Sequence, residues 1–432
     1  MRFSADWRDD AANAAPEERA TVADFRLFLD GQNVCQHLTG NSASDHLTLP
    51  LYNLAEGLAH GWWTLFGGRD HELPLIRFRS GFAMPDIRLS FDGDSFRYAA
   101  GQRSYVNPDV RFWAGPVETM PRQQAETELT TFIDTVLHRL NVCRVNRTSA
   151  ALRWARVQQS RADPEEAEFC EAAGALQLDP YQVSEADAAT IEAAAELFDG
   201  ECLTEFLAGT AMVDRQHLIQ WVKAADDRDP ERSAVPDLRD IAARVADAAP
   251  SHDNEPAWAL GYRRARQLRH VLNLRPTERV MDYEDFARRL GAGRKFAPAA
   301  VTNGIRVLRT RTGDTMHLHM RRHGPKASQA YLFTFARGVG DAVCFPNDHR
   351  SPVNELRSAY RQAAGRACAA EFLAPVEELV AMRRDGYDIV SISEVFMVST
   401  EVVERQLENV ERIEWACRTE PVTTAGLSNQ TA

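Results

Sequence analysis

Apolar residues recur at helical or alternating spacing along much of the first 150 residues. In residues 49–68 they are three or four positions apart, which predicts an amphipathic helix. Residues 86–101 alternate between apolar and polar side chains around Asp92-Gly93, which predicts a β-hairpin. Pro121 opens an apolar stripe that predicts another helix. We therefore expect a compact α/β domain over residues 21–147, after a polar, Ala-rich segment (1–20) that we expect to be a flexible N-terminus.

Residues 148–254 show helical periodicity and no pattern that is typical of a strand. The segment is rich in Ala and Glu, and we expect breaks at Asp179-Pro180 and in the polar run 249–256. The pattern predicts a helical middle domain that ends in a linker.

The last part of the chain mixes the two patterns. Helical spacing marks residues 258–274, 283–293, 331–343, 351–375, 376–384 and 392–410. The run 331–343 contains two glycines, which its helical spacing tolerates. Residues 304–311 and 315–322 are strand-like. We expect an α+β domain over residues 255–415 and a polar tail at 416–432, which makes the whole chain an α+β multidomain protein.

Composition and charge narrow the class of protein. The 432 residues suffice for two to four domains, and 44% of them are hydrophobic, as in ordinary globular proteins. The formal net charge of -12 disfavours bulk binding to nucleic acid or to anionic lipid. The seven cysteines form no C-x-x-C pair, which is typical of a reducing compartment. Since no apolar run approaches the ~18 residues of a membrane span, we expect a cytoplasmic protein without a membrane partner.

Three motifs follow one another in the last part of the chain. FTFARGVGDAV stands where a metallopeptidase helix has the form F-T-L-A-H-E-L-G-H, and CAAEFLAP (Cys368–Pro375) is close to F-A-A-E-L-L-x-P. EVFMVSTEVVERQLEN is close to a trailing A-x-x-F-x-V-S-x-x-A-V-x-x-x-L. Over roughly residues 255–412 this order resembles the ImmA/IrrE family of metallo-endopeptidases. The resemblance implies a zincin-like α+β domain with a small helix-turn-helix-like end.

The resemblance also implies the position of a zinc site. In the family, two histidines and a downstream acidic residue bind Zn²⁺, and a glutamate between the histidines activates the metal-bound water. These four positions fall on Arg337, Gly338, Asp341 and Ala364. A guanidinium offers no lone pair, and glycine and alanine have no side-chain oxygen, so we expect no catalytic site and no zinc cofactor.

Arg337 and Asp341 are four residues apart on one predicted helix, which places them on the same face. We hypothesise that they form an ion pair in the vacated metal position. The alternative is that they are two unrelated surface charges.

Other metal or catalytic sites have weaker support. His319 and His323 are four residues apart, but they lie in a strand-like run, where this spacing does not bring side chains together. His317, His349 and Cys344 would contribute ligands only if the fold gathered them. The sequence contains no Walker A, dinucleotide-binding or nucleophile-elbow motif.

Two further segments each allow two interpretations. Ser399 is suited to cap a helix that runs through Asn409 and resembles the second helix of a helix-turn-helix. Its glutamates outnumber its arginines, which favours packing on the domain over contact with DNA. Trp62, Trp63 and Phe66 form an aromatic cluster that belongs either to a core, which we favour, or to a partner-binding surface.

The expected function is that of a catalytically inactive ImmA/IrrE-like pseudo-peptidase that binds a protein or peptide partner. The resemblance implies regulation in stress response, mobile-element control or defence. One alternative is an active zinc metallo-endopeptidase with non-standard ligands. A second alternative is a helix-turn-helix transcription regulator, although nucleic acid is the less favoured partner.

Overall fold

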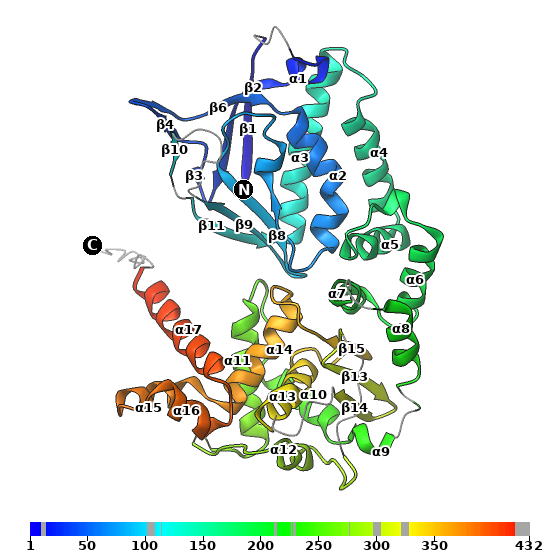
Figure 1. Ribbon diagram of the computed structural model, residues 1–432, viewed down its shortest axis with the longest axis vertical. Helices are drawn as coiled ribbons and strands as arrows, with labels where there is room; N and C mark the ends of the chain where they lie inside the picture. The colour runs from blue at the N-terminus through cyan, green and yellow to red at the C-terminus, as the bar shows by residue number, and fades with distance from the viewer. Residues whose placement is uncertain are drawn as a thin grey trace, which may run out of the picture.

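The computed structural model describes residues 1–9, 14–101, 109–113, 115–210, 214–225, 227, 230–275, 277–296, 304–320 and 328–419. The N-terminal α/β part and the helix-rich C-terminal part lie at opposite ends of the molecule (Figure 1). A column of helices over residues 149–223 runs along one side and connects them.

The N-terminal part consists of small antiparallel sheets and two long helices. Its elements are β1 (Arg2–Trp7), α1 (Pro16–Ala20), β2 (Val22–Leu29), β3 (Gln32–Asn33), β4 (His37–Thr39), β5 (Ser42–Ser44), β6 (Leu47–Pro50), α2 (Tyr52–Gly67), β7 (Leu73–Pro74), the 3₁₀ helix η1 (Leu75–Phe78), β8 (Asp86–Phe91), β9 (Ser95–Gly101), β10 (Val110–Phe112), β11 (Val117–Pro121) and α3 (Arg122–Val142). Strand β2 pairs with β1, β3 and β6, and the other two sheets have the orders β11-β9-β8-β7 and β10-β4-β5. Helices α2 and α3 lie side by side against the strands (Figure 1).

Several local predictions for this part are confirmed. Helix α2 fills the predicted helical run, α3 begins directly after Pro121, and β8 and β9 form the predicted hairpin. The hairpin turn places Gly93 at a φ of 103°, a conformation that favours glycine. Trp62, Trp63 and Phe66 are buried, and the Trp62 ring lies 4.8 Å from that of Phe66. The aromatic cluster therefore belongs to the core.

The prediction of a flexible N-terminus over residues 1–20 was wrong for most of this segment. Strand β1 pairs with β2 along its whole length, and α1 follows it. The alternation of Phe3, Ala5 and Trp7 explains the strand, because these side chains pack against the core. The Phe3 ring stacks on that of Phe132 in α3 at 4.4 Å. The first residues thus complete the domain.

The middle part is helical, as predicted. Its elements are α4 (Ser149–Arg161), α5 (Pro164–Ala175), the 3₁₀ helix η2 (Pro180–Gln182), α6 (Glu185–Ala195), α7 (Gly200–Gly209) and α8 (Arg215–Lys223). Helix α5 crosses α2 at two glycines with almost no space between the backbones. A Cβ atom at Gly174 would lie 2.1 Å from the Trp63 carbonyl oxygen, and one at Gly67 would lie 2.1 Å from that of Glu171. This crossing fixes the middle helices on the N-terminal part.

The C-terminal part has a four-stranded antiparallel sheet with the order β12-β14-β13-β15, surrounded by helices. Its elements are α9 (Pro230–Ser233), β12 (Ala234–Val235), α10 (Leu238–Ala248), α11 (Ala257–Val271), α12 (Tyr283–Arg289), β13 (Val307–Thr312), β14 (Thr315–Met320), α13 (Ser328–Cys344), β15 (Arg350–Val353), α14 (Tyr360–Leu373), α15 (Val376–Arg384), α16 (Ile389–Phe396) and α17 (Thr400–Thr419). Strands β13 and β14 and the glycine-containing helix α13 confirm the predictions for these runs.

Three features of this part differ from the predictions. The two-residue strand β12 lies in the segment that was expected to have no strand, and it pairs with β14. Strand β15 replaces the start of the predicted helix 351–375. Among the described strands it pairs with β13 alone, so Pro352 lies on an edge strand, where proline is tolerated. Helix α17 continues to Thr419, beyond Asn409 and into the expected tail.

Helix α10 packs with the C-terminal part, although it lies before the expected domain boundary at residue 254. Its side chains Leu238, Ile241 and Val245 belong to the same apolar core as α13 and α14.

Among the described residues, no helix is both long enough and apolar enough to cross a bilayer.

Gly174→Ala is expected to lower the free energy of unfolding by about 1–3 kcal/mol or more, because the added methyl group overlaps the backbone of α2. Gly293→Ala is the matched control, since a Cβ atom there meets nothing within 4 Å. Urea unfolding of both variants measures the difference. Equal stability of Gly174→Ala and wild type would contradict the close crossing.

Candidate functional site

Helices α13 and α14 cross closely beside Arg337, Asp341 and Ala364, three of the four positions implied by the resemblance. A Cβ atom at Gly340 would lie only 2.8 Å from the Gly365 carbonyl oxygen. A Cβ atom at Gly365 would lie 3.6 Å from both the carbonyl oxygen of Arg337 and the amide nitrogen of Asp341. Ala364, the remaining position, is fully buried beside this contact. The backbone thus brings these three positions close together, and their side chains decide the chemistry.

Gly338 faces the sheet on another side of α13. A Cβ atom there would lie 3.0 Å from Val307 Cγ1 and 3.3 Å from Leu318 Cδ2. These atoms belong to the apolar inner face of β13 and β14. A glutamate at position 338 would therefore collide with the core, so the position is unsuited to a general base.

Asp341 lies in a buried ion-pair network rather than beside Arg337. Its carboxylate accepts hydrogen bonds from Arg309 Nε at 2.7 Å, from Ser351 Oγ at 3.0 Å and from Arg361 Nη2 at 3.3 Å. Burial opposes ionisation of this carboxyl, but Arg309 and Arg361 outweigh burial and hold its pKa below the usual range. Asp341 is therefore a carboxylate that two cations already neutralise.

Arg337 has different partners, so the hypothesis of an Arg337–Asp341 ion pair was wrong. Its guanidinium donates to the Asn354 carbonyl oxygen, and Nη1 lies 3.3 Å from Glu355 Oε1. The physical reason is competition by long-range contacts. Two guanidinium groups from β13 and α14 reach the Asp341 carboxylate, while the segment after β15 supplies acceptors for Arg337. The alternative of two surface charges was also wrong, because both side chains are buried.

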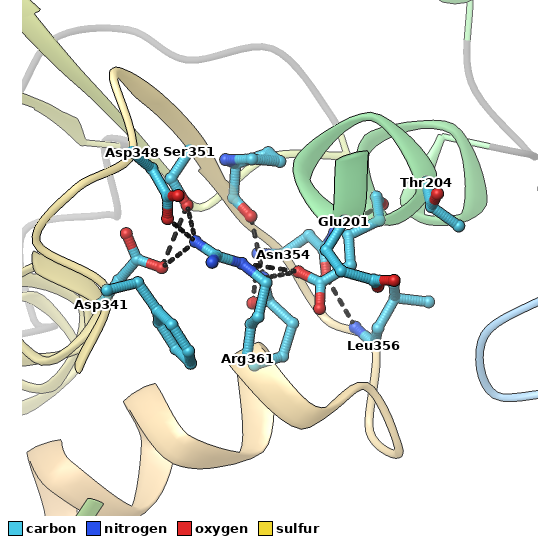
Figure 2. Close-up of polar contacts among 12 residues, drawn as sticks. Glu201, Thr204, Asp341, Asp348, Ser351, Asn354, Leu356 and Arg361 are labelled. Carbon is cyan, nitrogen blue, oxygen red and sulfur yellow. Dashed lines mark hydrogen bonds and ion pairs between the residues drawn. The ribbon is translucent and has the colours of Figure 1, made fainter. Parts of the chain in front are cut away.

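The network extends through Arg361 to a second and a third acidic residue (Figure 2). Arg361 Nη2 lies 2.7 Å from Asp348 Oδ2, and Arg361 Nε lies 4.0 Å from Glu205 Oε2. Glu205 comes from α7 of the middle part and is completely buried. Gln362 Nε2 donates to Glu205 Oε2 at 2.7 Å, and Asn354 Nδ2 donates to the Glu205 carbonyl oxygen at 2.9 Å. Helix α7 is thereby joined to the C-terminal part by polar contacts.

The same helix also contacts the N-terminal part. Arg69, which follows α2, donates to Glu201 Oε2 at 2.6 Å. The neighbouring Asp70 carboxylate accepts hydrogen bonds from the backbone amides of Arg357 and Ser358. The segment between β15 and α14 therefore contacts both α7 and the N-terminal part.

Arg337 lines a cavity of about 870 Å³ that is bounded by α11, α13, α14 and α17. Phe333, Ala363 and Val402 contribute apolar wall, and Trp258 lies at the same cavity with 40% of its surface exposed. This volume is within the range of about 300–1,000 Å³ that is common for ligand sites. The first of the four implied positions thus faces space that a ligand is able to enter.

The histidines do not gather as zinc ligands in the described part of the chain. His317 Nδ1 lies 3.1 Å from Ser233 Oγ, His319 is buried on the same strand, and His349 is exposed. Cys344 is buried at the end of α13, and His323 lies outside the described residues. Within those residues, no three His, Cys, Asp or Glu side chains are arranged to hold a metal ion.

Sequence reasoning did not identify Arg309, Arg361 or Glu205 as site residues. One signal was present: Glu205 stands among Leu203, Phe206 and Leu207 in a helix with few other polar residues. A charge in an apolar helical run indicates a buried partner, but the sequence does not say which of the arginines supplies it.

Comparison of the chain with protein families, with curated proteins and with solved structures finds no match.

Burial raises the pKa of Glu205 from 4.5 to about 7, while Arg361 and Gln362 oppose the shift. A carboxyl with a raised folded-state pKa binds its proton more tightly in the folded state. The free energy of unfolding that Glu205 contributes therefore falls as the pH rises from 4.5 to about 7. Between pH about 5 and about 8 this loss amounts to about 2–3 kcal/mol.

Glu205→Gln removes the titrating group and keeps its shape. We expect the stability of this variant, relative to wild type, to increase by about 2–3 kcal/mol from pH about 5 to about 8 in urea unfolding. Glu192→Gln, on the exposed face of α6, is the control and should follow the wild-type pH dependence. Parallel pH profiles of wild type and Glu205→Gln would contradict the prediction.

Proposed function

We propose that the C-terminal part is a zincin-like, ImmA/IrrE-like domain without peptidase activity, which binds a segment of a partner protein in the cavity beside Arg337. The resemblance of the three motifs supports the family, and we infer a regulatory role in stress response, mobile-element control or defence. The proposed site of action is the cytoplasm.

The state of Asp341 is the observation that carries the proposal. A catalytic zinc site needs about three protein ligands with free lone pairs and an activated water molecule. Asp341 is occupied by Arg309, Arg361 and Ser351, and Arg337 has no lone pair to offer. Zinc at Asp341 would have to displace two guanidinium groups from a buried position. This favours binding without hydrolysis over an active zinc endopeptidase.

The surface of α17 argues against the transcription-regulator alternative. Val403 and Gln406 are buried, and Gln406 Nε2 donates to the Ala370 carbonyl oxygen of α14 at 3.2 Å. The exposed residues include Glu401, Glu404 and Glu408. A helix with this face repels the phosphate backbone, so we propose that α17 completes the cavity instead.

Filling the cavity is expected to abolish partner binding. In Ala363→Leu the larger side chain occupies space beside Arg337, and Ala381→Leu, on the exposed face of α15, is the matched control. We expect tagged wild type and Ala381→Leu to co-purify the same intact protein from the native host, and Ala363→Leu to retain at least about tenfold less, which corresponds to ~1.4 kcal/mol.

Two results would contradict the proposal. Retention of the partner by Ala363→Leu would place its binding site elsewhere. Cleavage of the partner by the purified wild-type protein, prevented by a chelator, would establish an active metallopeptidase.

A further inference from the structure

The wall of the cavity beside Arg337 is strongly cationic, although the chain as a whole carries a net charge of -12. Its described lining includes five arginines and two glutamates: Arg306, Arg337, Arg357, Arg366, Arg405, Glu355 and Glu401. A concave surface with one sign of charge concentrates ligands of the opposite sign. The cavity therefore favours an anionic partner, although the molecule as a whole is negatively charged.

Both glutamates are already paired within the wall. Glu355 Oε1 lies 2.6 Å from Arg306 Nε and 3.3 Å from Arg337 Nη1, and Glu401 Oε1 lies 2.6 Å from Arg405 Nη2. One carboxylate thus serves two guanidinium groups. The excess of positive charge stays with the remaining arginines.

Two arginines have no carboxylate partner in the wall. Arg366 donates to the carbonyl oxygens of Leu356 and Arg357 at 2.7 and 2.6 Å, and these acceptors carry no net charge. The Arg357 side chain is exposed, and its guanidinium makes no hydrogen bond within the described part of the chain. Neither side chain has to give up a hydrogen-bonded ion pair to bind an anion, although the nearby Asp70 carboxylate offsets part of the charge of Arg366.

The guanidinium of Arg337, on the buried side of the cavity, is only partly paired. Arg337 is only 7% exposed, and its Nε atom has no hydrogen-bond partner among the described residues. Burial, together with the neighbouring Arg366, lowers the pKa of Arg337 to about 10, although Glu355 opposes the shift. A buried cation of this kind is stabilised by an incoming carboxylate.

The wall also has apolar surface beside its polar residues. Phe333, Ala367 and Val402 line the cavity, and Trp258 is exposed beside them. Such a surface suits an aliphatic or aromatic side chain better than a free inorganic anion. Cationic and apolar surfaces therefore face the same space.

We propose that this cavity recognises an acidic peptide segment, with a Glu or Asp carboxylate bound by Arg357 and Arg366 and a neighbouring apolar side chain placed against Phe333 and Val402. This inference rests on the proposed partner-binding function and specifies the chemistry of the partner. It makes recognition dependent on charge, and hence on ionic strength.

The test uses the full chain and a fluorescently labelled, end-blocked Glu-Phe-Glu-Leu peptide, with Gln-Phe-Gln-Leu as the neutral counterpart, in fluorescence anisotropy. We expect the acidic peptide to bind at least about tenfold more tightly, and added salt to weaken its binding. Arg357→Gln should weaken binding of the acidic peptide about tenfold and leave the neutral peptide unchanged. Arg384→Gln, at another exposed arginine on α15, is the control and should change neither.

Equal affinity for the two peptides, or unchanged affinity in Arg357→Gln, would overturn the acidic specificity. Full competition by inorganic phosphate at constant ionic strength would identify a small-anion site and would also overturn it. Either result leaves the capture experiment with Ala363→Leu unaffected, so failure of this inference is distinguishable from failure of the proposed function.

Discussion

The buried Asp341 carboxylate between Arg309 and Arg361 is the interaction on which the rest of the C-terminal part depends. Its partners come from β13, β15 and α14, so one carboxylate ties the sheet to both crossing helices. Removing one member of a buried ion pair leaves the other charge buried without a partner. The resulting loss of stability is larger than the net stabilisation that the intact pair provides. The network therefore holds the sheet and the two helices together, and it occupies the carboxylate that a metal would need.

The polar contacts continue from this network to the N-terminal part. Glu205 of α7 lies beside Arg361, Glu201 of the same helix accepts a hydrogen bond from Arg69, and Asp70 accepts from the backbone amide of Arg357. The Arg357 side chain also lines the cavity. The rim of the proposed binding site and the junction between the parts thus share one short segment. Asp70 and α7 therefore contact the segment that lines one side of the cavity.

The predictions that held were those that depend on short-range pattern. Apolar spacing identified α2 and α13, and alternation around Gly93 identified the β8–β9 hairpin. The glycines of α13 do not interrupt this helix, and they make close contacts with β13, β14 and α14. The predictions that failed depend on partners far away in the chain. Spacing of four residues suggested that Arg337 pairs with Asp341, whereas Arg309 and Arg361, which lie 32 and 20 residues from Asp341, take that carboxylate. Local sequence does not show which of several distant residues will form a contact. Strands β1 and β12 were missed for the same reason, because the strands that they pair with follow later in the chain.

The most direct measurement of the central claim is the free energy of unfolding of wild type and Asp341→Asn in urea, each with and without a zinc chelator. The substitution removes the buried carboxylate that Arg309 and Arg361 share and leaves the partly exposed Asp348 near both of them. We therefore predict a loss of about 3 kcal/mol and no effect of the chelator on either protein. If the chelator destabilised the wild type and removed its advantage over Asp341→Asn, Asp341 would be a metal ligand, and the ion-pair account would be wrong.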